Sequence, residues 1–396
     1  MSMIGAYSDE VKELLPGVWT PLKWVFLLGL LTFLPAHFLP LAGKQVNNIF
    51  YVTVALPVLL SVVLSFRYWA VLVWNGRFLF GFLFVVSIAI LASGRPTDLK
   101  PWLYTTLFCL AVAHCSHHQR LFRLVLNAFA AILISLAGLA LLQWGMDSIE
   151  SGRAARMQLW GAGDNPNFSA LAIAGALLYL WLFHVERRLS GRAWQIVGLC
   201  LLCAAVILVG VAGQSRSTLL GFVLFMLFYA FLRGKAIVVA GVVAGVVLAV
   251  FLLGWHEIIA QRGLSYRPVI WADLLSRFYE GCNLVLGCGR EKLVLAGKFE
   301  GPHSAYFGTL YSYGFLGAAA FMLFALSYFR SSICRKSDWF LVSLLGWGAS
   351  VTMMDGFIGS PAPLWIYFWL PTVAALYQPG VSEPTSPEHD TRESAS

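Results

Sequence analysis

Apolar runs of about 18 residues recur along almost the whole chain, and this feature limits its possible folds more than any other. A run of that length crosses the hydrocarbon core of a bilayer as an α-helix. Inside lipid, a spanning backbone must satisfy its own hydrogen bonds. Since 59% of the 396 residues are hydrophobic and only 12% are charged, the sequence predicts an all-α, polytopic integral membrane protein.

We expect about twelve transmembrane helices in one membrane domain, residues 1–377. The tail that follows, 378–396, is rich in Pro and Ser, and we expect it to be disordered and cytoplasmic. No small-residue cleavage site follows the first apolar run, so the first span is expected to remain as a signal anchor. The predicted spans are 24–41, 49–66, 78–93, 101–115, 121–144, 168–185, 194–213, 218–232, 236–254, 304–329, 340–357 and 363–377.

The distribution of Lys and Arg predicts the orientation of these spans. One set of alternate short loops carries twelve Lys or Arg residues, and the opposite set carries six. The positive-inside rule assigns the first set and both termini to the cytoplasm. Most of the net charge of +8 belongs to this loop bias, so it does not indicate binding to nucleic acid. Three segments are then external: 145–167, 213–218 and the long hydrophilic segment 255–303.

The long external segment has nearly balanced charge, with six Lys or Arg and five Asp or Glu. Over 267–279, apolar residues recur at roughly helical spacing. This pattern predicts an amphipathic helix that rests on the membrane surface. Arg267 lies near the start of that helix.

Arg216 lies in the tight turn between two apolar runs, on the side where the positive-inside rule disfavours a cation. Charges at membrane depth usually mark function or a buried partner. Arg216 also begins the next predicted helix, where a cation opposes the helix dipole. Both features are explained if the helix and the guanidinium face an anion such as phosphate. The alternative, an arginine that extends to the lipid headgroups, remains open.

His303 closes the long external segment, directly before an apolar run. The preceding Gly301-Pro302 pair predicts a helix start with proline at the first helical position. A neutral imidazole near pH 7 accepts a proton, so His303 is a candidate general base, although a packed histidine is the simpler alternative. Tyr306 and Tyr313 follow on about the same helical face. Such an aromatic strip suits a sugar ring, and it suits packing against lipid or core equally well.

Two motifs are missing from the sequence. The external segments contain no D-x-D pair, so a metal-dependent transferase with a carboxylate clamp is not favoured, and no metal site is predicted. There is no G-x-x-x-x-G-K-[ST] segment either, which argues against an ATP-driven transport motor.

The candidate residues belong to a longer pattern. Arg216 with Leu220, and His303 with Gly314, resemble the R-x3-L and H-x10-G motifs of the O-antigen ligases, the bacterial family that joins O-polysaccharide to lipid A–core. "SYRPVIW" resembles the S-x-R-x3-W stretch of the wider O-antigen ligase and polymerase superfamily, and "NLVLGCGREK" resembles its P-x-x-G-x-G segment with the proline replaced. The number of spans, the late long loop and the order of the motifs extend the resemblance over most of the chain.

The resemblance implies a glycosyltransferase C-type fold in the bacterial inner membrane, with the active site facing the periplasm. It implies an inverting, metal-independent transfer without a cofactor. O-polysaccharide moves from undecaprenyl pyrophosphate to a sugar hydroxyl of lipid A–core, which completes lipopolysaccharide. Arg216 and Arg267 match the family's donor-binding arginines, and His303 matches its candidate base. A pyrophosphate leaving group needs fixed cations, and arginine supplies them with bidentate geometry.

Other residues are candidates for lining the site without a match to a family motif. Asn167 lies in a "DNPN" turn that helix capping explains equally well. Cys282 and Cys288 lie six residues apart in a glycine-containing loop. Since the periplasm is oxidising, we predict that they form a disulfide. The candidates for site lining are Asn167, Arg290, Tyr306 and Tyr313.

Three other assignments remain open. An O-antigen polymerase uses the same kind of donor but extends glycan on glycan. A protein O-oligosaccharyltransferase of the same superfamily differs in its acceptor. A transporter of lipid-linked glycans belongs to a different class, and the lack of a detectable repeat or of mid-span charged pairs argues against it.

Overall fold

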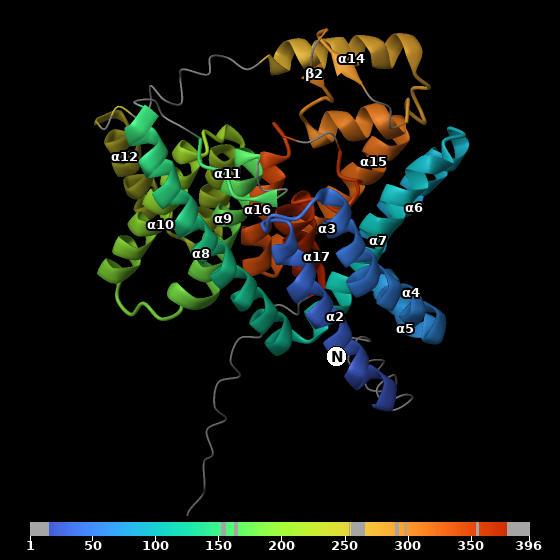
Figure 1. The fold of residues 1–396 in the computed structure, drawn as a ribbon, viewed down its shortest axis with the longest axis horizontal. Coiled ribbons are helices and arrows are strands. Elements are labelled where there is room, and N and C mark those ends of the chain that lie inside the picture. The colour runs from blue at the N-terminus through green and yellow to red at the C-terminus, as the bar shows by residue number, and fades with distance from the viewer. Residues whose placement is uncertain are drawn as a thin grey trace, which may run out of the picture.

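The computed structural model describes residues 16–151, 156–161, 165–252, 254, 266–289, 293–297, 299–353 and 356–377. Arg290 and the tail 378–396 lie outside the described residues. The fold is a bundle of helices with one very small antiparallel sheet, in which Val294 pairs with Glu300 (Figure 1).

The elements follow in chain order. They are α2 (Pro16–Ala36), α3 (Gly43–Phe50), η1 (Tyr51–Ala55), α4 (Leu56–Leu64), α5 (Phe66–Asn75), α6 (Arg77–Ala92), η2 (Pro96–Asp98), α7 (Leu99–His117), α8 (Gln119–Ser151), α9 (Pro166–Leu180), η4 (Trp181–Val185), α10 (Arg192–Ala212), α11 (Arg216–Arg233), α12 (Ala236–Leu252), α14 (Arg267–Gly281), β1 (Val294–Leu295), β2 (Phe299–Glu300), α15 (Ala305–Cys334), α16 (Asp338–Ala349), η5 (Trp365–Trp369) and α17 (Leu370–Tyr377).

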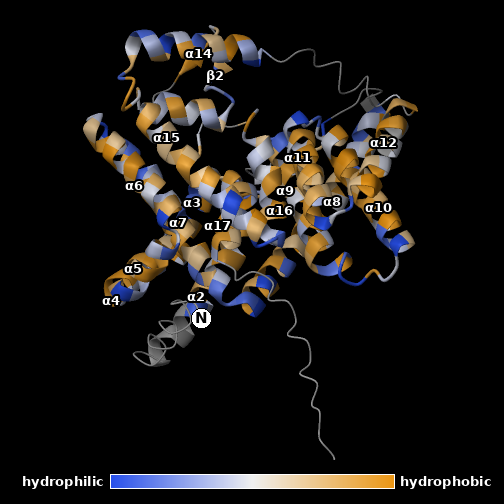
Figure 2. Cartoon of the chain, turned by 180° about the vertical axis from the view of Figure 1, so that it is seen from behind, coloured by the Kyte–Doolittle hydropathy of each residue, from blue (hydrophilic) through white to orange (hydrophobic). Residues whose placement is uncertain are grey.

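Each predicted span overlaps a helix or a run of helices in the described chain. Among the described residues, six helices are long and apolar enough to cross a membrane, or seven if the bent pair α5–α6 is one span. The protein is therefore an all-α, multi-pass membrane protein, while the total of twelve spans stays a prediction. Many apolar side chains are exposed, among them Val63, Ile237 and Leu252, as expected where lipid replaces water. Hydrophobic residues predominate along most of the helices (Figure 2).

One helix pair bends sharply, and one predicted span ends early. Helices α5 and α6 meet at 102°. Gly76 lies at this corner, where a side chain would clash with the hydroxyl of Tyr377, which donates to the carbonyl oxygen of Leu72 at 2.7 Å. The eleventh predicted span, 340–357, is helical only to Ala349.

Helices α11 and α16 pack closely against each other, and this contact depends on two glycines. A Cβ atom on Gly348 would lie 2.7 Å from the Cα atom of Gly221, so only hydrogen fits between the two backbones. Small residues of this kind let membrane helices approach closely. Since Arg216 begins α11, this contact also holds the start of α11 in a fixed place.

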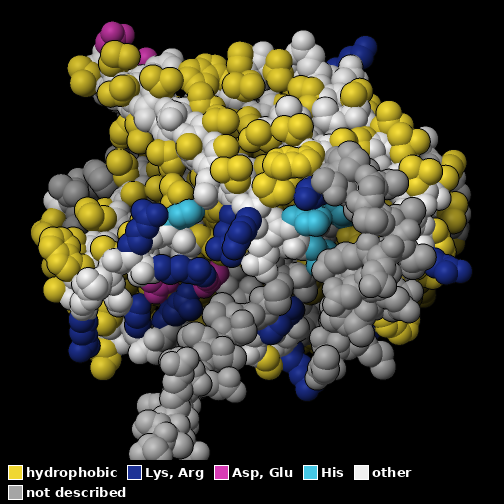
Figure 3. Space-filling view, turned by 90° about the horizontal axis from the view of Figure 1, so that it is seen from below, with side chains coloured by type: hydrophobic (Ala, Val, Ile, Leu, Met, Phe, Trp, Pro, Cys, Tyr) yellow, Lys and Arg dark blue, Asp and Glu magenta, His cyan; other side chains and the backbone are white. Residues whose placement is uncertain are grey.

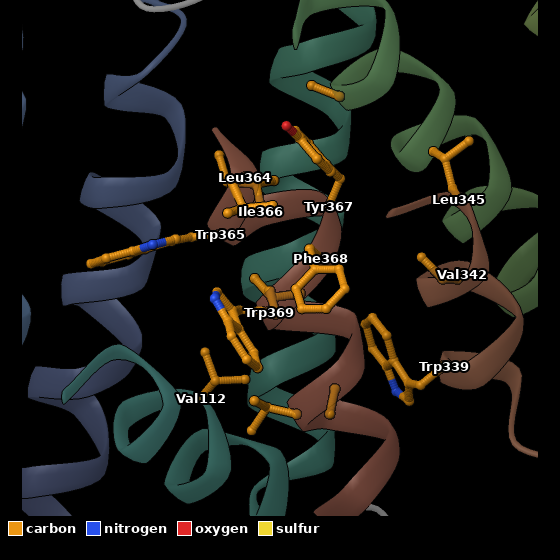
Figure 4. Packing of buried hydrophobic residues seen from close by; sticks show 14 of the residues in the cluster. Val112, Trp339, Val342, Leu345, Leu364, Trp365, Ile366, Tyr367, Phe368 and Trp369 are labelled. Atoms are coloured by element: carbon orange, nitrogen blue, oxygen red, sulfur yellow. The ribbon is translucent and has the colours of Figure 1, made fainter. Parts of the chain in front are cut away.

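Aromatic rings fill the centre of the bundle. Trp339, Trp365 and Trp369 are fully buried (Figure 4). The ring of Trp369 lies 4.9 Å from that of Phe368, nearly perpendicular to it. Its indole N–H donates to the carbonyl oxygen of Phe357 at 2.8 Å, which satisfies the only polar atom of the side chain. The bundle is thus rigidly packed beneath the site described below.

The described part of the long hydrophilic segment, from 266 onwards, forms a separate layer at one end of the molecule. Helix α14 lies above the first part of α15, which changes direction within its length (Figure 1). The predicted amphipathic helix is therefore present. Its apolar side chains, Ile270, Leu274 and Phe278, are buried against Leu295 and Tyr311 rather than facing a membrane surface, contrary to the sequence prediction.

The opposite end of the bundle carries an ion-pair cluster. Helix α11 runs from Arg216 to Arg233, so the cluster at its end lies far from Arg216. Lys and Arg side chains surround acidic ones on this underside of the molecule (Figure 3). The pairs are Arg187–Asp338 (2.6 Å), Lys235–Glu186 (3.1 Å), Arg233–Glu186 (3.4 Å) and Arg233–Asp338.

Candidate active site

A cavity of about 340 Å³ brings together the two arginines and the histidine that the sequence singled out. Arg216 and His303 are far apart in sequence, and the fold brings both of them to the lining of the same cavity. Asn167 also lines this cavity. The lining residues are Asn167, Arg216, Ser217, Tyr266, Arg267, Ile270, Phe299 and His303.

Arg216 is the first residue of α11, as predicted. The turn before it is strained, because Gln214 has a φ of 48°, a region that non-glycine residues rarely occupy. Ser215 is the N-cap, and its hydroxyl accepts a hydrogen bond from the backbone N–H of Thr218 at 3.4 Å. The turn and the cap together fix where α11 begins, and so fix the backbone of Arg216 at the cavity wall.

Three helices begin at this cavity. Arg216 opens α11, Arg267 opens α14, and Asn167 is the second residue of α9. The side chain of Asn165 caps α9 by accepting from the N–H of Asn167 at 3.0 Å, so the capping interpretation of the "DNPN" turn is confirmed. A helix N-terminus carries partial positive charge. The backbone therefore adds to the charge of the two guanidinium groups.

His303 lies in the turn before α15 and not inside the helix. The helix begins at Ala305 with Ser304 as its N-cap, so the predicted start at Gly301-Pro302 is wrong. The reason is local: His303 has a φ of 49°, which interrupts any helix at that point. The first amide of the helix, that of Ala305, donates to the carbonyl oxygen of Ser350 at 2.9 Å. A neighbouring chain segment thus anchors the helix start next to His303.

The spacing from His303 to Gly314 has a structural cause. Gly314 breaks α15 with φ 63° and ψ −166°, a backbone conformation that is essentially restricted to glycine. The first arm of α15 therefore runs between His303 and the break, under α14, and the second arm continues into the bundle (Figure 1). The glycine sets the direction of the arm that begins beside His303.

The loop 284–289 supplies the hydrogen bonds that the break removes from α15. This loop belongs to the segment that resembled P-x-x-G-x-G. Two amides beyond the break donate to the loop, and two amides of the loop donate to carbonyl groups before the break. Donor first, the bonds are Phe315–Leu284 (2.8 Å), Leu316–Val285 (3.1 Å), Cys288–Tyr311 (2.8 Å) and Gly289–Ser312 (3.0 Å).

The predicted disulfide between Cys282 and Cys288 is confirmed, with the two Cα atoms 4.8 Å apart. It closes the loop that docks on the break in α15. Within the loop, the backbone N–H of Gly287 donates to the carbonyl oxygen of Asn283 at 2.6 Å. The disulfide therefore restricts the conformations of the loop 284–289, whose amide and carbonyl groups must match those of α15 at its break.

Two predicted lining residues, both tyrosines, are not among the described residues that line the cavity. Tyr306 turns into the bundle, where its hydroxyl donates to the carbonyl oxygen of Trp347 at 2.9 Å. Tyr313 is only 2% exposed, in the same core. Both tyrosines therefore have the packing role that the sequence left open. Arg290 lies outside the described residues.

The sequence prediction missed four lining residues: Ser217, Tyr266, Ile270 and Phe299. Tyr266 precedes Arg267 within the "SYRPVIW" motif, which was a usable signal. Its ring lies 5.2 Å from that of Phe299, and Phe299 in turn lies 6.5 Å from the imidazole of His303. An aromatic wall thus continues up to His303. Nothing in the local sequence marks Phe299, which the β1–β2 hairpin brings into place.

The charge of the cavity is positive. It contains the guanidinium groups of Arg216 and Arg267. Among the described residues, no acidic side chain lines it. The two guanidinium groups share this cavity with an imidazole and two aromatic rings. Fold and cavity together define a multi-pass α-helical membrane protein with a positively charged cavity that also carries a histidine.

Comparison with known proteins adds the family. The chain is 30% identical over 378 residues to an O-antigen ligase of Pseudomonas aeruginosa strain PAO1, and the match covers 89% of this chain and 90% of that protein. The chain therefore belongs to the O-antigen ligase family. No protein-family model matches the sequence, and no solved structure matches the fold.

Proposed function

We propose that this protein transfers O-polysaccharide from undecaprenyl pyrophosphate to a sugar hydroxyl of lipid A–core, with inversion at the anomeric carbon. The observation that carries the proposal is the meeting of Arg216, Arg267 and His303 at one cavity. A family of ligases acting on a lipid-linked glycan needs such a combination of fixed positive charge and proton acceptor.

Arg216 and Arg267 bind the pyrophosphate of the donor. As the bond between the anomeric carbon and the phosphate oxygen breaks, both electrons stay with that oxygen. The developing negative charge is stabilised by two guanidinium groups and by the N-termini of α9, α11 and α14. Because these groups are held by the fold, they need little reorganisation during the reaction.

His303 accepts the proton of the attacking hydroxyl group. The hydroxyl oxygen forms the new bond to the anomeric carbon from the side opposite the pyrophosphate, which inverts the configuration. The proton is then released from the imidazolium to solvent. Energy stored in the donor bond drives the transfer, so neither a nucleotide nor a metal ion takes part.

Tyr266 and Phe299 contact the sugar that reacts. Aromatic faces and edges pack well against the apolar C–H faces of a sugar ring, while the ring hydroxyl groups remain free for hydrogen bonds. Phe299 lies next to His303. The rings therefore hold a sugar within reach of the base.

We place the cavity on the periplasmic side of the inner membrane. Its position at the end of α11 opposite the Lys- and Arg-rich cluster supports this orientation. Cysteines can be introduced at Tyr279, exposed on α14, and at Arg188, exposed after η4, in a chain that lacks the exposed Cys200 and Cys334. In whole cells, a membrane-impermeant maleimide should label Tyr279→Cys and not Arg188→Cys. The reverse result would refute the orientation.

The base role is tested with His303→Asn. Asparagine accepts the left-handed backbone conformation of this position better than most residues, so the variant should keep the turn. It cannot take a proton near neutral pH. Transfer by purified protein should fall by about 10²–10⁴ while the donor still binds. Normal transfer by His303→Asn would remove the base role and leave the family assignment intact.

The acceptor is tested in cells that lack the protein. Loss of a ligase should remove all O-antigen bands from lipopolysaccharide gels and leave free core. Loss of a polymerase would leave core with one repeat unit. Loss of a transporter would hold the donor in the cytoplasmic leaflet. A protein oligosaccharyltransferase would instead leave lipopolysaccharide intact and alter glycoproteins.

A further inference from the structure

The conformation of His303 requires support from its surroundings. A residue with a side chain is disfavoured at a φ of 49°, so the turn persists only where neighbouring contacts hold it. His303 precedes α15 and is not included in its helical hydrogen bonds. The support must therefore come from other elements.

Trp271 of α14 contacts the chain on both sides of His303. Its indole N–H donates to the carbonyl oxygen of Pro302 at 3.0 Å. Its ring lies 5.0 Å from the ring of Phe307, at an interplanar angle of 31°. The hydrogen bond fixes the peptide group that enters His303, and the ring contact fixes the first turn of the helix that follows.

Trp271 also shares helix α14 with Arg267. The two residues are four positions apart on α14, so they lie on the same side of that helix, one turn from each other. Arg267 lines the cavity, whereas Trp271 does not. A single indole thus connects the helix that carries a phosphate-binding arginine with the turn that carries the imidazole.

We propose that Trp271 is a positioning residue that sets the imidazole of His303 relative to Arg267. The inference rests on the proposed function, because it assigns Trp271 a role through His303. Without the indole N–H, the peptide group of Pro302 is free to turn, and His303 relaxes towards an ordinary negative φ. The imidazole then leaves the position that it needs for proton transfer. Small displacements of this kind cost up to about 100-fold in rate.

Two complementary substitutions separate the hydrogen bond from the packing. Trp271→Phe keeps an aromatic ring against Phe307 and loses the N–H donor. Trp271→His keeps an N–H donor at the same number of bonds from Cβ, through its Nε2 atom, and loses most of the ring area. A control, Trp102→Phe, removes an indole bond of the same kind, to the carbonyl oxygen of Leu83 at 2.6 Å, away from the cavity.

We expect Trp271→Phe to fold and bind the lipid-linked donor with an unchanged KM, while kcat falls by about 10-fold or more. Trp271→His should recover most of this kcat, and Trp102→Phe should leave it unchanged. The inference is overturned if Trp271→Phe keeps its kcat, or if Trp271→His loses as much as Trp271→Phe. Failure of both variants to fold would make Trp271 a structural residue and would also overturn it. If only Trp271→Phe misfolds, the test rests on Trp271→His. A kcat of folded Trp271→His that is about 10-fold or more below that of the wild type would then overturn the inference.

The outcome for His303→Asn separates this inference from the proposed function. If His303→Asn transfers normally, the proposed base role is wrong, and the positioning role falls with it. If His303→Asn is impaired while Trp271→Phe is normal, only the positioning role is wrong. In the double variant, Trp271→Phe should add no further loss to His303→Asn, since the group that it positions is absent. Additive losses would contradict the inference.

Discussion

Gly314 and Gly287 lie so close together that a Cβ atom on either would come within 2.6 Å of the backbone nitrogen of the other. The first glycine breaks α15, and the second belongs to the loop that the Cys282–Cys288 disulfide closes. Both have a positive φ, 63° and 79°, so each is required for its conformation as well as for its size. The pair is one of the close backbone contacts between the loop that follows α14 and the break in α15.

Replacement of Gly314 by Ala should therefore affect the site from a distance. Strain at such a position costs roughly 1–3 kcal/mol, and the added methyl group also clashes with Val285 and Gly287. We expect Gly314→Ala to insert into membranes but to lose at least 10-fold in transfer, as the first arm of α15 moves. Gly81→Ala in α6, where a Cβ meets nothing within 4 Å, is the matched control. Equal activity of the two variants would argue against a role for the break.

Removal of the disulfide should loosen the docking loop. A bridge between residues six apart restricts the unfolded chain by roughly 2 kcal/mol in the chain-entropy model. We expect Cys282→Ser with Cys288→Ser to lower the Tm of the purified protein. Cys200→Ser with Cys334→Ser, which removes two exposed free thiols, should not. Mass spectrometry showing free thiols at Cys282 and Cys288 of the native protein would contradict the pairing.

The two cavity arginines should differ from an ordinary surface arginine in their tolerance of lysine. Lysine keeps the charge and lacks the planar fork that binds a phosphate group with two hydrogen bonds. We expect Arg216→Lys and Arg267→Lys to retain only part of the transfer activity and to raise the KM for donor, and the Ala variants to be nearly inactive. Arg277→Lys, on the exposed side of α14, should be normal. Full activity of the double variant Arg216→Lys, Arg267→Lys would show that neither arginine binds the donor.

Acid should weaken the contact between α14 and the β1–β2 turn through Asp273. Hydrogen bonds from Arg277, at 3.0 and 3.1 Å, and from the backbone N–H of Ala296, at 2.8 Å, lower the pKa of the Asp273 carboxyl below 3.8. A lowered pKa in the folded state contributes stability that is present above 3.8 and is lost as the pH falls through the lowered value.

At pH 7, Asp273→Asn should therefore have a lower Tm than the wild type, and the difference should shrink when both are measured below pH 3.8. Asn has one acceptor oxygen where Asp has two, so it also weakens the hydrogen bonds that join α14 to the backbone N–H of Ala296 in the β1–β2 turn. A difference in Tm that stays constant with pH would mean that the charge of Asp273 has no part in the effect.

Transfer should not depend on a metal ion or a nucleotide. The proposed charge stabilisation comes from Arg216, Arg267 and helix N-termini, which a chelator does not remove. Purified protein treated with EDTA and freed of nucleotide should keep its full rate on a lipid-linked donor. A loss that Mg²⁺ or Mn²⁺ restores would contradict this mechanism.

The sequence determined the membrane class, the places of most helices and the three residues that meet at the cavity. Apolar length predicts a spanning helix without knowledge of its neighbours, because lipid forces each backbone to form its own hydrogen bonds. Arg216, Arg267 and His303 were marked by charge, compartment and motif spacing. The disulfide was predicted from the spacing of Cys282 and Cys288 and from the compartment that the distribution of Lys and Arg predicts for them.

Only the tertiary structure decided how these parts are used. The start of α15 was misplaced because His303 has a φ of 49°, which the Gly301-Pro302 pair does not predict, and because the adjoining carbonyl group of Pro302 bonds to Trp271 of another helix. The break at Gly314 depends on a loop whose amides replace the lost helical bonds. Tyr306 and Tyr313 share the helical face expected for site residues, yet that face packs into the core, while Phe299 reaches the cavity from a hairpin. Helix propensity is local and can be read from the chain, whereas the direction of a side chain is fixed by contacts between residues that are distant in sequence.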